Sequence, residues 1–222
     1  MIYVLGTRTT SSEVADLQEQ PWAVAGYVEN QWHKKIAFAG KPVYWWEDIP
    51  TLGETALFVC GIASSFHRRA YVESVEARYR LRWWEVRHPS AAVSATAKIG
   101  DGCIFSRLVA VASNTKLGRH CFLNRGVLLG HDCTVGDFVT FSPGANVAGC
   151  CTIGDGAYIA MGAIVVDRTV IGANAFVAAG AVVTQDVPPN TAVRGVPAKP
   201  FRLREGSRVL DRIDASKYEL HA

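Results

Sequence analysis

The stretch Leu129-Gly-His-Asp-Cys-Thr-Val135-Gly-Asp-Phe-Val-Thr-Phe141 returns to a large apolar residue every six positions. The same step holds from Val93 to Val183, and all sixteen residues of this series are apolar. The residues four places further on, from Ala97 to Val187, form a second series of small side chains. A period of six fits neither a helix nor the alternation of a strand. It predicts a parallel β-helix of hexapeptide repeats, in which each hexad forms a short strand and a corner.

Glycine indicates the length of each coil. It follows the apolar residue at Gly100, Gly118, Gly136, Gly154 and Gly172, which is every eighteenth position. Three hexads therefore complete one turn, and residues eighteen apart are expected to stack about 4.8 Å apart on successive coils. Sixteen hexads predict between five and six coils.

The cysteines follow the same repeat. Cys103, Cys121, Cys133 and Cys151 all belong to the small series, so we expect them to be buried and free of disulfides. The chain has no Cys-x-x-Cys motif. The adjacent side chains of Cys150 and Cys151 are expected to point to opposite faces of the strand. No zinc site or other metal site is predicted.

The first ninety residues predict a different architecture. Apolar runs at residues 2–6, 22–29 and 56–62 indicate strands, and residues 10–19 and 65–79 have the patterns of short helices. Residues 80–86 are expected to close this unit. Strands that alternate with helices predict a small parallel, Rossmann-like α/β layer, a type that binds ligands at the carboxyl ends of its strands. The predicted organisation is an α/β domain over residues 1–87, a β-helix over 88–188, and a loop and tail over 189–222.

The composition is that of a soluble globular protein. Of the 222 residues, 49% are hydrophobic and 19% are charged, and no apolar run approaches the roughly 20 residues that span a bilayer. The N-terminus has no signal-peptide pattern, so we expect a cytoplasmic protein without a membrane partner. The net charge of +3 arises in residues 189–222, and no nucleic-acid surface is predicted because the rest of the chain has no basic stripe.

One residue pair in the repeats has the chemistry of a catalytic group. His131 is expected at an outward corner with Asp132 beside it. A histidine exchanges protons near neutral pH, and a neighbouring carboxylate raises its basicity and holds its tautomer. His120, the other histidine of the repeats, has no adjacent carboxylate. From residue chemistry alone, both also fit exposed corner positions without a function.

Several motifs resemble those of a known family. They are His88-Pro-Ser-Ala91, Gly130-His-Asp-Cys133, Ser142-Pro-Gly-Ala145 and Gly195-Val-Pro-Ala-Lys199. The chain resembles the hexapeptide-repeat sugar acyltransferases of the NeuD and nucleotide-linked amino-sugar N-acetyltransferase family. This family includes bacillosamine- and perosamine-type enzymes. The resemblance covers nearly the whole chain, to about residue 204. The resemblance implies a left-handed β-helix, acetyl-CoA as co-substrate, no metal, and a homotrimer with active sites between subunits.

The resemblance also implies roles for individual residues. His131 corresponds to the general base and Asp132 to the carboxylate that enhances it. The residues on the acceptor side correspond to Asn124, Arg8, Thr9, Thr10, Glu29, Asn30 and Gly61. Those on the acetyl-CoA side correspond to Thr140, Gly149, Met161, Ala179 and Lys199. The first loop lacks the glycines of the family pattern, and Asn30 replaces its second acidic residue.

The implied reaction is transfer of an acetyl group from acetyl-CoA to the 4-amino group of a nucleotide-linked 4-amino-4,6-dideoxy sugar, with His131 as base and no acyl-enzyme. Two alternatives remain open, a sugar O-acetyltransferase that uses the same base and a non-catalytic trimeric scaffold. A zinc carbonic anhydrase on the same fold requires three histidines at the subunit interface. The repeats contain only His120 and His131.

Overall fold

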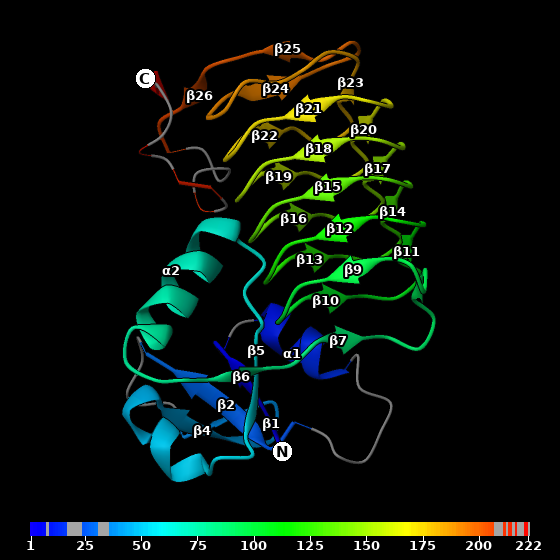
Figure 1. Ribbon diagram of the computed structural model, residues 1–222. Helices are drawn as coiled ribbons and strands as arrows, with labels where there is room; N and C mark the ends of the chain where they lie inside the picture. Colours follow the sequence, from blue (N-terminus) through cyan, green and yellow to red (C-terminus); the bar gives the residue numbers. More distant parts are fainter. Residues whose placement is uncertain are drawn as a thin grey trace.

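A β-helix with three faces occupies the second half of the chain (Figure 1). The structure is a computed structural model, and it describes residues 1–7, 9–16, 24–30, 36–206, 211, 213–214, 216 and 220–221. The first face is an eight-stranded sheet of β7 (Val86–Arg87), β10 (Ile104–Phe105), β13 (Phe122–Leu123), β16 (Thr140–Phe141), β19 (Tyr158–Ile159), β22 (Phe176–Val177), β24 (Ala192–Arg194) and β25 (Lys199–Pro200). The second face is a six-stranded sheet of β8 (Ala92–Val93), β11 (Ala110–Val111), β14 (Leu128–Leu129), β17 (Asn146–Val147), β20 (Ile164–Val165) and β23 (Val182–Val183). The third face is a five-stranded sheet of β9 (Lys98–Ile99), β12 (Lys116–Leu117), β15 (Thr134–Val135), β18 (Thr152–Ile153) and β21 (Val170–Ile171).

Each coil repeats after eighteen residues. Strand β10 pairs in parallel with β13, which aligns Ile104 with Phe122, and β14 pairs with β17, which aligns Leu129 with Val147. The second residue of each strand points inward, and Phe105 is fully buried there. The predicted left-handed β-helix and its three-hexad coil are confirmed. The four cysteines of the inward series are buried and free, as predicted.

An α/β layer precedes the β-helix, as predicted. Its sheet has the order β3-β4-β2-β1-β5-β6, and all neighbours are parallel except β3 and β4. The strands are β1 (Ile2–Leu5), β2 (Gly26–Glu29), β3 (Ala37–Phe38), β4 (Lys41–Trp45), β5 (Leu57–Cys60) and β6 (Arg82–Trp83). The helices are α1 (Thr9–Asp16), α2 (Ser65–Glu76) and a 3₁₀ helix (Trp46–Leu52).

Two strands of this layer differ from the prediction. The strand expected over residues 22–29 begins only at Gly26, and residues 17–23 lie outside the described part of the chain. Strand β4 was not predicted, because Pro42 interrupts its pattern and proline is rare in strands. It lies near the edge of the sheet, between β2 and the short β3.

The strands of the β-helix extend beyond the limits expected from the sequence. Strand β7 already pairs with β10 and aligns Val86 with Ile104, and β24 still pairs with β22. The division of the chain into domains stays a prediction. Further along, β26 (Leu203–Arg204) pairs with β27 (Leu220–His221). Among the described residues, no helix has the length and apolarity needed to cross a bilayer.

A buried arginine joins the two parts. Arg68 of α2 is almost completely buried, and its guanidinium donates to backbone carbonyls of both parts of the chain. His120 lies beside it, between the rings of Trp83 and Phe138, and is also fully buried. Burial, with smaller effects of Arg119 and Arg68, lowers the pKa of His120 to about 3. Within the described residues, its Nδ1 has no hydrogen-bond partner.

This histidine predicts a pH dependence of stability. In the unfolded chain it takes up a proton near pH 6.5, and in the folded chain only near pH 3. The unfolded state therefore binds more protons between these values, and the free energy of unfolding should fall as the pH drops, by about 2 kcal/mol between pH 6.5 and pH 5. Urea unfolding at a series of pH values measures this. His120→Phe keeps an aromatic ring and should flatten that part of the profile; an unchanged slope would contradict the assignment.

Candidate active site

His131 and Asp132 form a hydrogen-bonded pair at the corner between the second and third faces. They occupy the turn between β14 and β15, and His131 Nδ1 lies 2.8 Å from Asp132 Oδ2. Asn114, one coil earlier, donates from Nδ2 to the other carboxylate oxygen at 3.1 Å. The bond from His131, and then the bond from Asn114, lower the pKa of the Asp132 carboxyl below its ordinary value. An ionised Asp132 thus accepts a hydrogen bond from Nδ1, which leaves the lone pair of the imidazole on Nε2.

The turn repeats every coil and stacks equivalent residues. Asn114, Asp132 and Cys150 occupy one position of the turn, with φ angles of 61°, 55° and 60°. His131 and Gly149 occupy the position just before it. The amide N–H of Cys150 donates to the carbonyl of His131, and that of Asp132 donates to the carbonyl of Ser113. The stacked backbones therefore fix where the side chains of this corner begin.

Gly149 provides space for the imidazole. A Cβ atom at this position would lie 2.6 Å from Nε2 of His131 and 2.7 Å from its Cε1. Any side chain at position 149 would thus push the ring away, so glycine is required for the observed ring position. The Gly149 carbonyl accepts from the N–H of Arg168. Its own N–H makes no hydrogen bond to any residue that the structure describes, so it can donate to a ligand next to Nε2.

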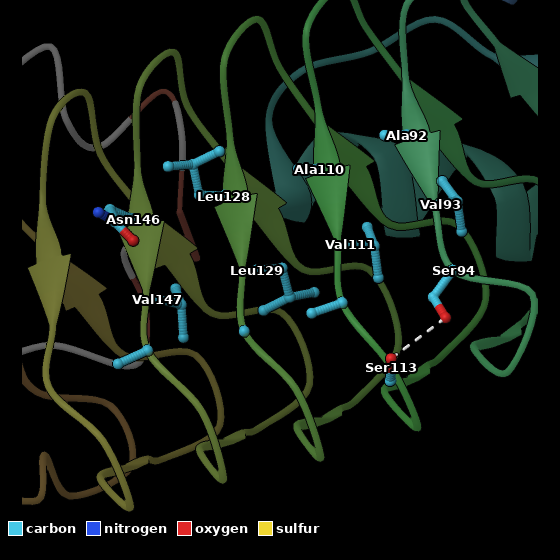
Figure 2. A pocket seen from close by; sticks show the side chains of 13 residues that line it. Ala92, Val93, Ser94, Ala110, Val111, Ser113, Leu128, Leu129, Asn146 and Val147 are labelled. Carbon is cyan, nitrogen blue, oxygen red and sulfur yellow. Dashed lines mark hydrogen bonds between the residues drawn. The ribbon is translucent and has the colours of Figure 1, made fainter.

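A groove runs over the second face beside this corner (Figure 2). Its volume is about 610 Å³. The residues that line it belong to β8, β11, β14 and β17 and to the positions directly after these strands, and most are apolar, as Ala92, Ala110 and Leu128 are. The groove reaches Gly130, the residue before His131. Leu128 on β14 is 45% exposed, and Ile164 on β20 is 43% exposed. This face therefore offers an apolar surface beside the His131–Asp132 pair.

The predicted nucleotide-binding residues lie at the carboxyl ends of the α/β strands. Glu29 ends β2 and is buried; it accepts from the Thr7 hydroxyl at 2.5 Å and from the Asn30 N–H at 2.8 Å. Gly61 follows β5, and a Cβ there would lie 2.7 Å from Cα of Ser11. The structure thus brings Glu29, Asn30 and Gly61 to one edge of the sheet. Arg8 lies outside the described residues, and only the backbone positions of Thr9 and Thr10 in α1 are described.

The other predicted residues are spread over the β-helix. Asn124 is half-buried at the corner between the first and second faces, where its Oδ1 accepts from the N–H of Arg125. Met161 and Ala179 stack at this same corner, one coil apart, and both are exposed. Lys199 is exposed on β25. None of these four lies at the corner that holds His131.

Thr140 has a different environment from the one expected. It is buried on β16, its hydroxyl donates to the carbonyl of Ala63 at 2.9 Å, and it accepts from Arg68 at 2.9 Å. Its hydroxyl bonds the junction with α2, and the predicted contact with acetyl-CoA stays a prediction.

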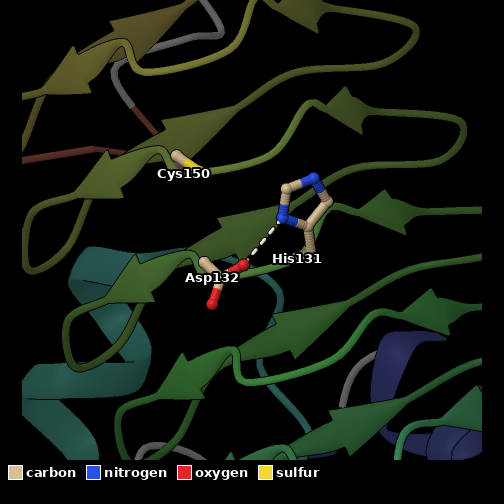
Figure 3. A group of neighbouring side chains, drawn as sticks. All are labelled: His131, Asp132 and Cys150. Atoms are coloured by element: carbon tan, nitrogen blue, oxygen red, sulfur yellow. Dashed lines mark hydrogen bonds and ion pairs between the residues drawn. The ribbon is translucent and has the colours of Figure 1, made fainter.

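Sequence reasoning missed one neighbour of the His131–Asp132 pair. The thiol of Cys150 lies close to His131 and Asp132, and the ligand atoms of the three side chains are all within 4.8 Å of one another (Figure 3). Cys150 is at the surface and Cys151 is buried, so the prediction that they face opposite ways is confirmed. The spacing of eighteen between Asp132 and Cys150 already contained the signal that they stack.

Comparison with known proteins agrees with both halves of the architecture. The family model of the bacterial transferase hexapeptide (six repeats) matches residues 150–185. A variant of perosamine N-acetyltransferase from Caulobacter crescentus, in complex with CoA and GDP-perosamine, is 25% identical with a TM-score of 0.83, over 90% of this chain and 96% of that one.

Two further solved structures have similar scores. The acetyltransferase domain of PglB from Neisseria gonorrhoeae, in complex with acetyl coenzyme A, is 28% identical with a TM-score of 0.82, over 90% of this chain and 98% of that one. WeeI from Acinetobacter baumannii AYE is 28% identical with a TM-score of 0.82, over 90% and 99%. No curated protein sequence matches the chain significantly.

Proposed function

We propose that the chain is an acyltransferase of the hexapeptide-repeat sugar N-acetyltransferase family and that it acetylates the 4-amino group of a nucleotide-linked 4-amino-4,6-dideoxy sugar with acetyl-CoA. The single observation that carries the proposal is the His131–Asp132 pair, joined at 2.8 Å beside Gly149. The similarity to perosamine N-acetyltransferase with bound CoA and GDP-perosamine supports the acceptor class. The similarity to the PglB domain with bound acetyl coenzyme A supports the donor.

The base in this reaction is Nε2 of His131. Asp132 holds the proton on Nδ1, so the lone pair of Nε2 is available to the acceptor amine. As the amine nitrogen forms a bond with the thioester carbon, Nε2 removes its proton. The C–S bond then breaks, and the departing CoA thiolate takes up the proton from the imidazolium. The transfer is direct, so no cysteine of the chain forms an acyl intermediate.

The N–H of Gly149 is the proposed donor to the oxyanion. Negative charge develops on the thioester oxygen when the amine attacks, and a fixed backbone N–H stabilises that charge by a few kcal/mol. Gly149 lies next to Nε2, and its N–H is not engaged by the described residues. Two stacked turns of one corner thus hold the base and the oxyanion donor next to each other.

The distribution of residues within one chain supports a trimer with active sites between subunits. The nucleotide-side residues Glu29 and Gly61 belong to the α/β layer, which contacts the β-helix at the corner of His120 and Phe138. His131 lies at another corner, between the second and third faces. In the proposed assembly, the sugar held by one subunit therefore reaches His131 of its neighbour. The apolar groove of the second face, with exposed Leu128 and Ile164, is the surface at which the donor and the neighbour meet.

Thiol release from acetyl-CoA tests the reaction. We expect turnover with one member of a panel of UDP-, dTDP- and GDP-linked 4-amino-4,6-dideoxy sugars, and with none of the corresponding 4-hydroxy sugars. Mass spectrometry should show one added acetyl group on the sugar nitrogen. Turnover only with the hydroxyl series would instead establish an O-acetyltransferase. A chain that does not bind acetyl-CoA at all would contradict the enzymatic proposal.

A further inference from the structure

We propose that His131, Asp132 and Cys150 form a site for Zn²⁺, and that the bound ion inhibits acetyl transfer. The inhibition rests on the proposed function of His131 as the base. The site itself rests only on the geometry of the three side chains, so binding and inhibition can be tested separately.

The three side chains converge from two coils of the β-helix. Asp132 and Cys150 are stacked in equivalent turn positions, and His131 precedes Asp132. Figure 3 shows the Asp132 carboxylate and the Cys150 thiol on the side of the imidazole that carries Nδ1. One nitrogen, one oxygen and one sulfur atom lie within 4.8 Å of one another. Small rotations of exposed side chains bring such atoms to the spacing of ligands around one ion.

The ligand set suits zinc better than the harder cations. Zn²⁺ binds thiolate, imidazole and carboxylate with tetrahedral geometry, whereas Mg²⁺ and Ca²⁺ prefer oxygen ligands only. Three protein ligands leave a fourth position for water or for a substrate atom.

Neighbouring charges do not oppose a cation at this corner. The next residue of the Cys150 column is Arg168, whose guanidinium pairs with Asp167 at 2.6 Å. The preceding residue of the column is Asn114, which is neutral and bonds the Asp132 oxygen Oδ1. The second oxygen, Oδ2, now bonds the imidazole. Zn²⁺ would take the place of the proton that lies between His131 and Asp132.

Occupancy would remove the base from the reaction. With Zn²⁺ on Nδ1, the neutral imidazole of His131 carries its proton on Nε2, which then has no lone pair to accept a proton from the amine. A chain with bound Zn²⁺ should therefore not catalyse acetyl transfer.

Binding is tested on the full chain without any substrate. We expect one Zn²⁺ per chain by isothermal titration calorimetry, and with Co²⁺ a sulfur-to-metal charge-transfer band that reports the thiolate directly. Cys150→Ser should weaken zinc binding tenfold or more and remove this band. His67→Ala, which removes an exposed histidine of α2, is the matched control and should bind zinc like the wild type. Equal zinc affinity in Cys150→Ser and the wild type, or no binding by the wild type, would overturn the site.

Inhibition is tested with acetyl-CoA and the accepted sugar. Zn²⁺ should inhibit the wild type reversibly, with recovery on addition of EDTA, whereas Cys150→Ser should keep its activity and lose most of the sensitivity. Equal inhibition of both would show that zinc acts elsewhere. If no sugar is turned over, the calorimetry and the Co²⁺ band still decide the metal site, so its failure and that of the proposed function are distinguishable. Cys150→Ala provides the same test should the serine variant fold poorly.

Discussion

His131→Ala is expected to lower kcat/KM for acetyl transfer by a factor of about 10² or more, because it removes the group that takes the proton from the attacking amine. The loss should fall on kcat, with the KM for acetyl-CoA within about threefold of the wild type, since the imidazole is proposed to act on the acceptor proton and not to hold the donor. Steady-state thiol release with the accepted sugar measures both constants. His67→Ala is the control for an exposed histidine and should leave them unchanged.

Two variants separate the chemistry of the ring from its position. Asp132→Asn keeps an oxygen for Nδ1 but removes the negative charge, so the activity should fall, but less than in His131→Ala. Gly149→Ala keeps all catalytic groups but adds a Cβ atom 2.6 Å from Nε2, which displaces the ring. Both variants should keep the thermal stability of the wild type. Wild-type activity in Gly149→Ala would show that the observed ring position is not the working one.

The fold could be predicted because its physical cause is periodic. An apolar residue recurs in register every eighteen positions, as Phe141 follows Leu123, so the sequence alone indicates which side chains stack and which face inward. The same eighteen-residue repeat places His131 beside Gly149 and Asp132 beside Cys150. It does not indicate which of the exposed corner side chains turn toward one another. That depends on local hydrogen bonds, such as the one from Asn114 to Asp132.

The junction between the two parts could not be predicted in this way. Glu29 has the pattern of a ligand-binding carboxylate at a strand end, but the fold uses its side chain to bond Thr7 and the backbone of Asn30. Thr140 has the position of a cofactor contact, but α2 covers it. Both depend on how the α/β layer packs internally or against the β-helix, and no repeat in the sequence describes that packing. Arg68 is the strongest example.

Within the described part of the chain, Arg68 holds this junction through hydrogen bonds to carbonyl and hydroxyl oxygens and has no acidic partner. Its Nε donates to the carbonyl of His120 at 2.8 Å, and Nη1 donates to those of Ile62 and Ala63 at 2.7 and 3.1 Å. Nη2 donates to the carbonyls of Phe138 and Val139 and to the Thr140 hydroxyl, at 2.9, 3.2 and 2.9 Å. Apart from the Thr140 hydroxyl on β16, the acceptors are backbone carbonyls of loops and corners, and they are brought together only in the folded chain.

Arg68→Met is therefore expected to destabilise the protein by about 3 kcal/mol or more, because it fills much of the same volume while several buried acceptors lose their donor. The corresponding fall in Tm is about 6 °C or more for a chain of this size. Arg68→Lys keeps the charge but has a single ammonium group in place of the branched guanidinium. Its stability should therefore lie between those of Arg68→Met and the wild type. Arg78→Ala, which removes an exposed arginine just after α2, should change stability by less than about 1 kcal/mol. Thermal and urea unfolding of the four proteins measure these differences. Wild-type stability in Arg68→Met would mean that apolar packing holds the two parts together, and that the buried guanidinium contributes no net stability.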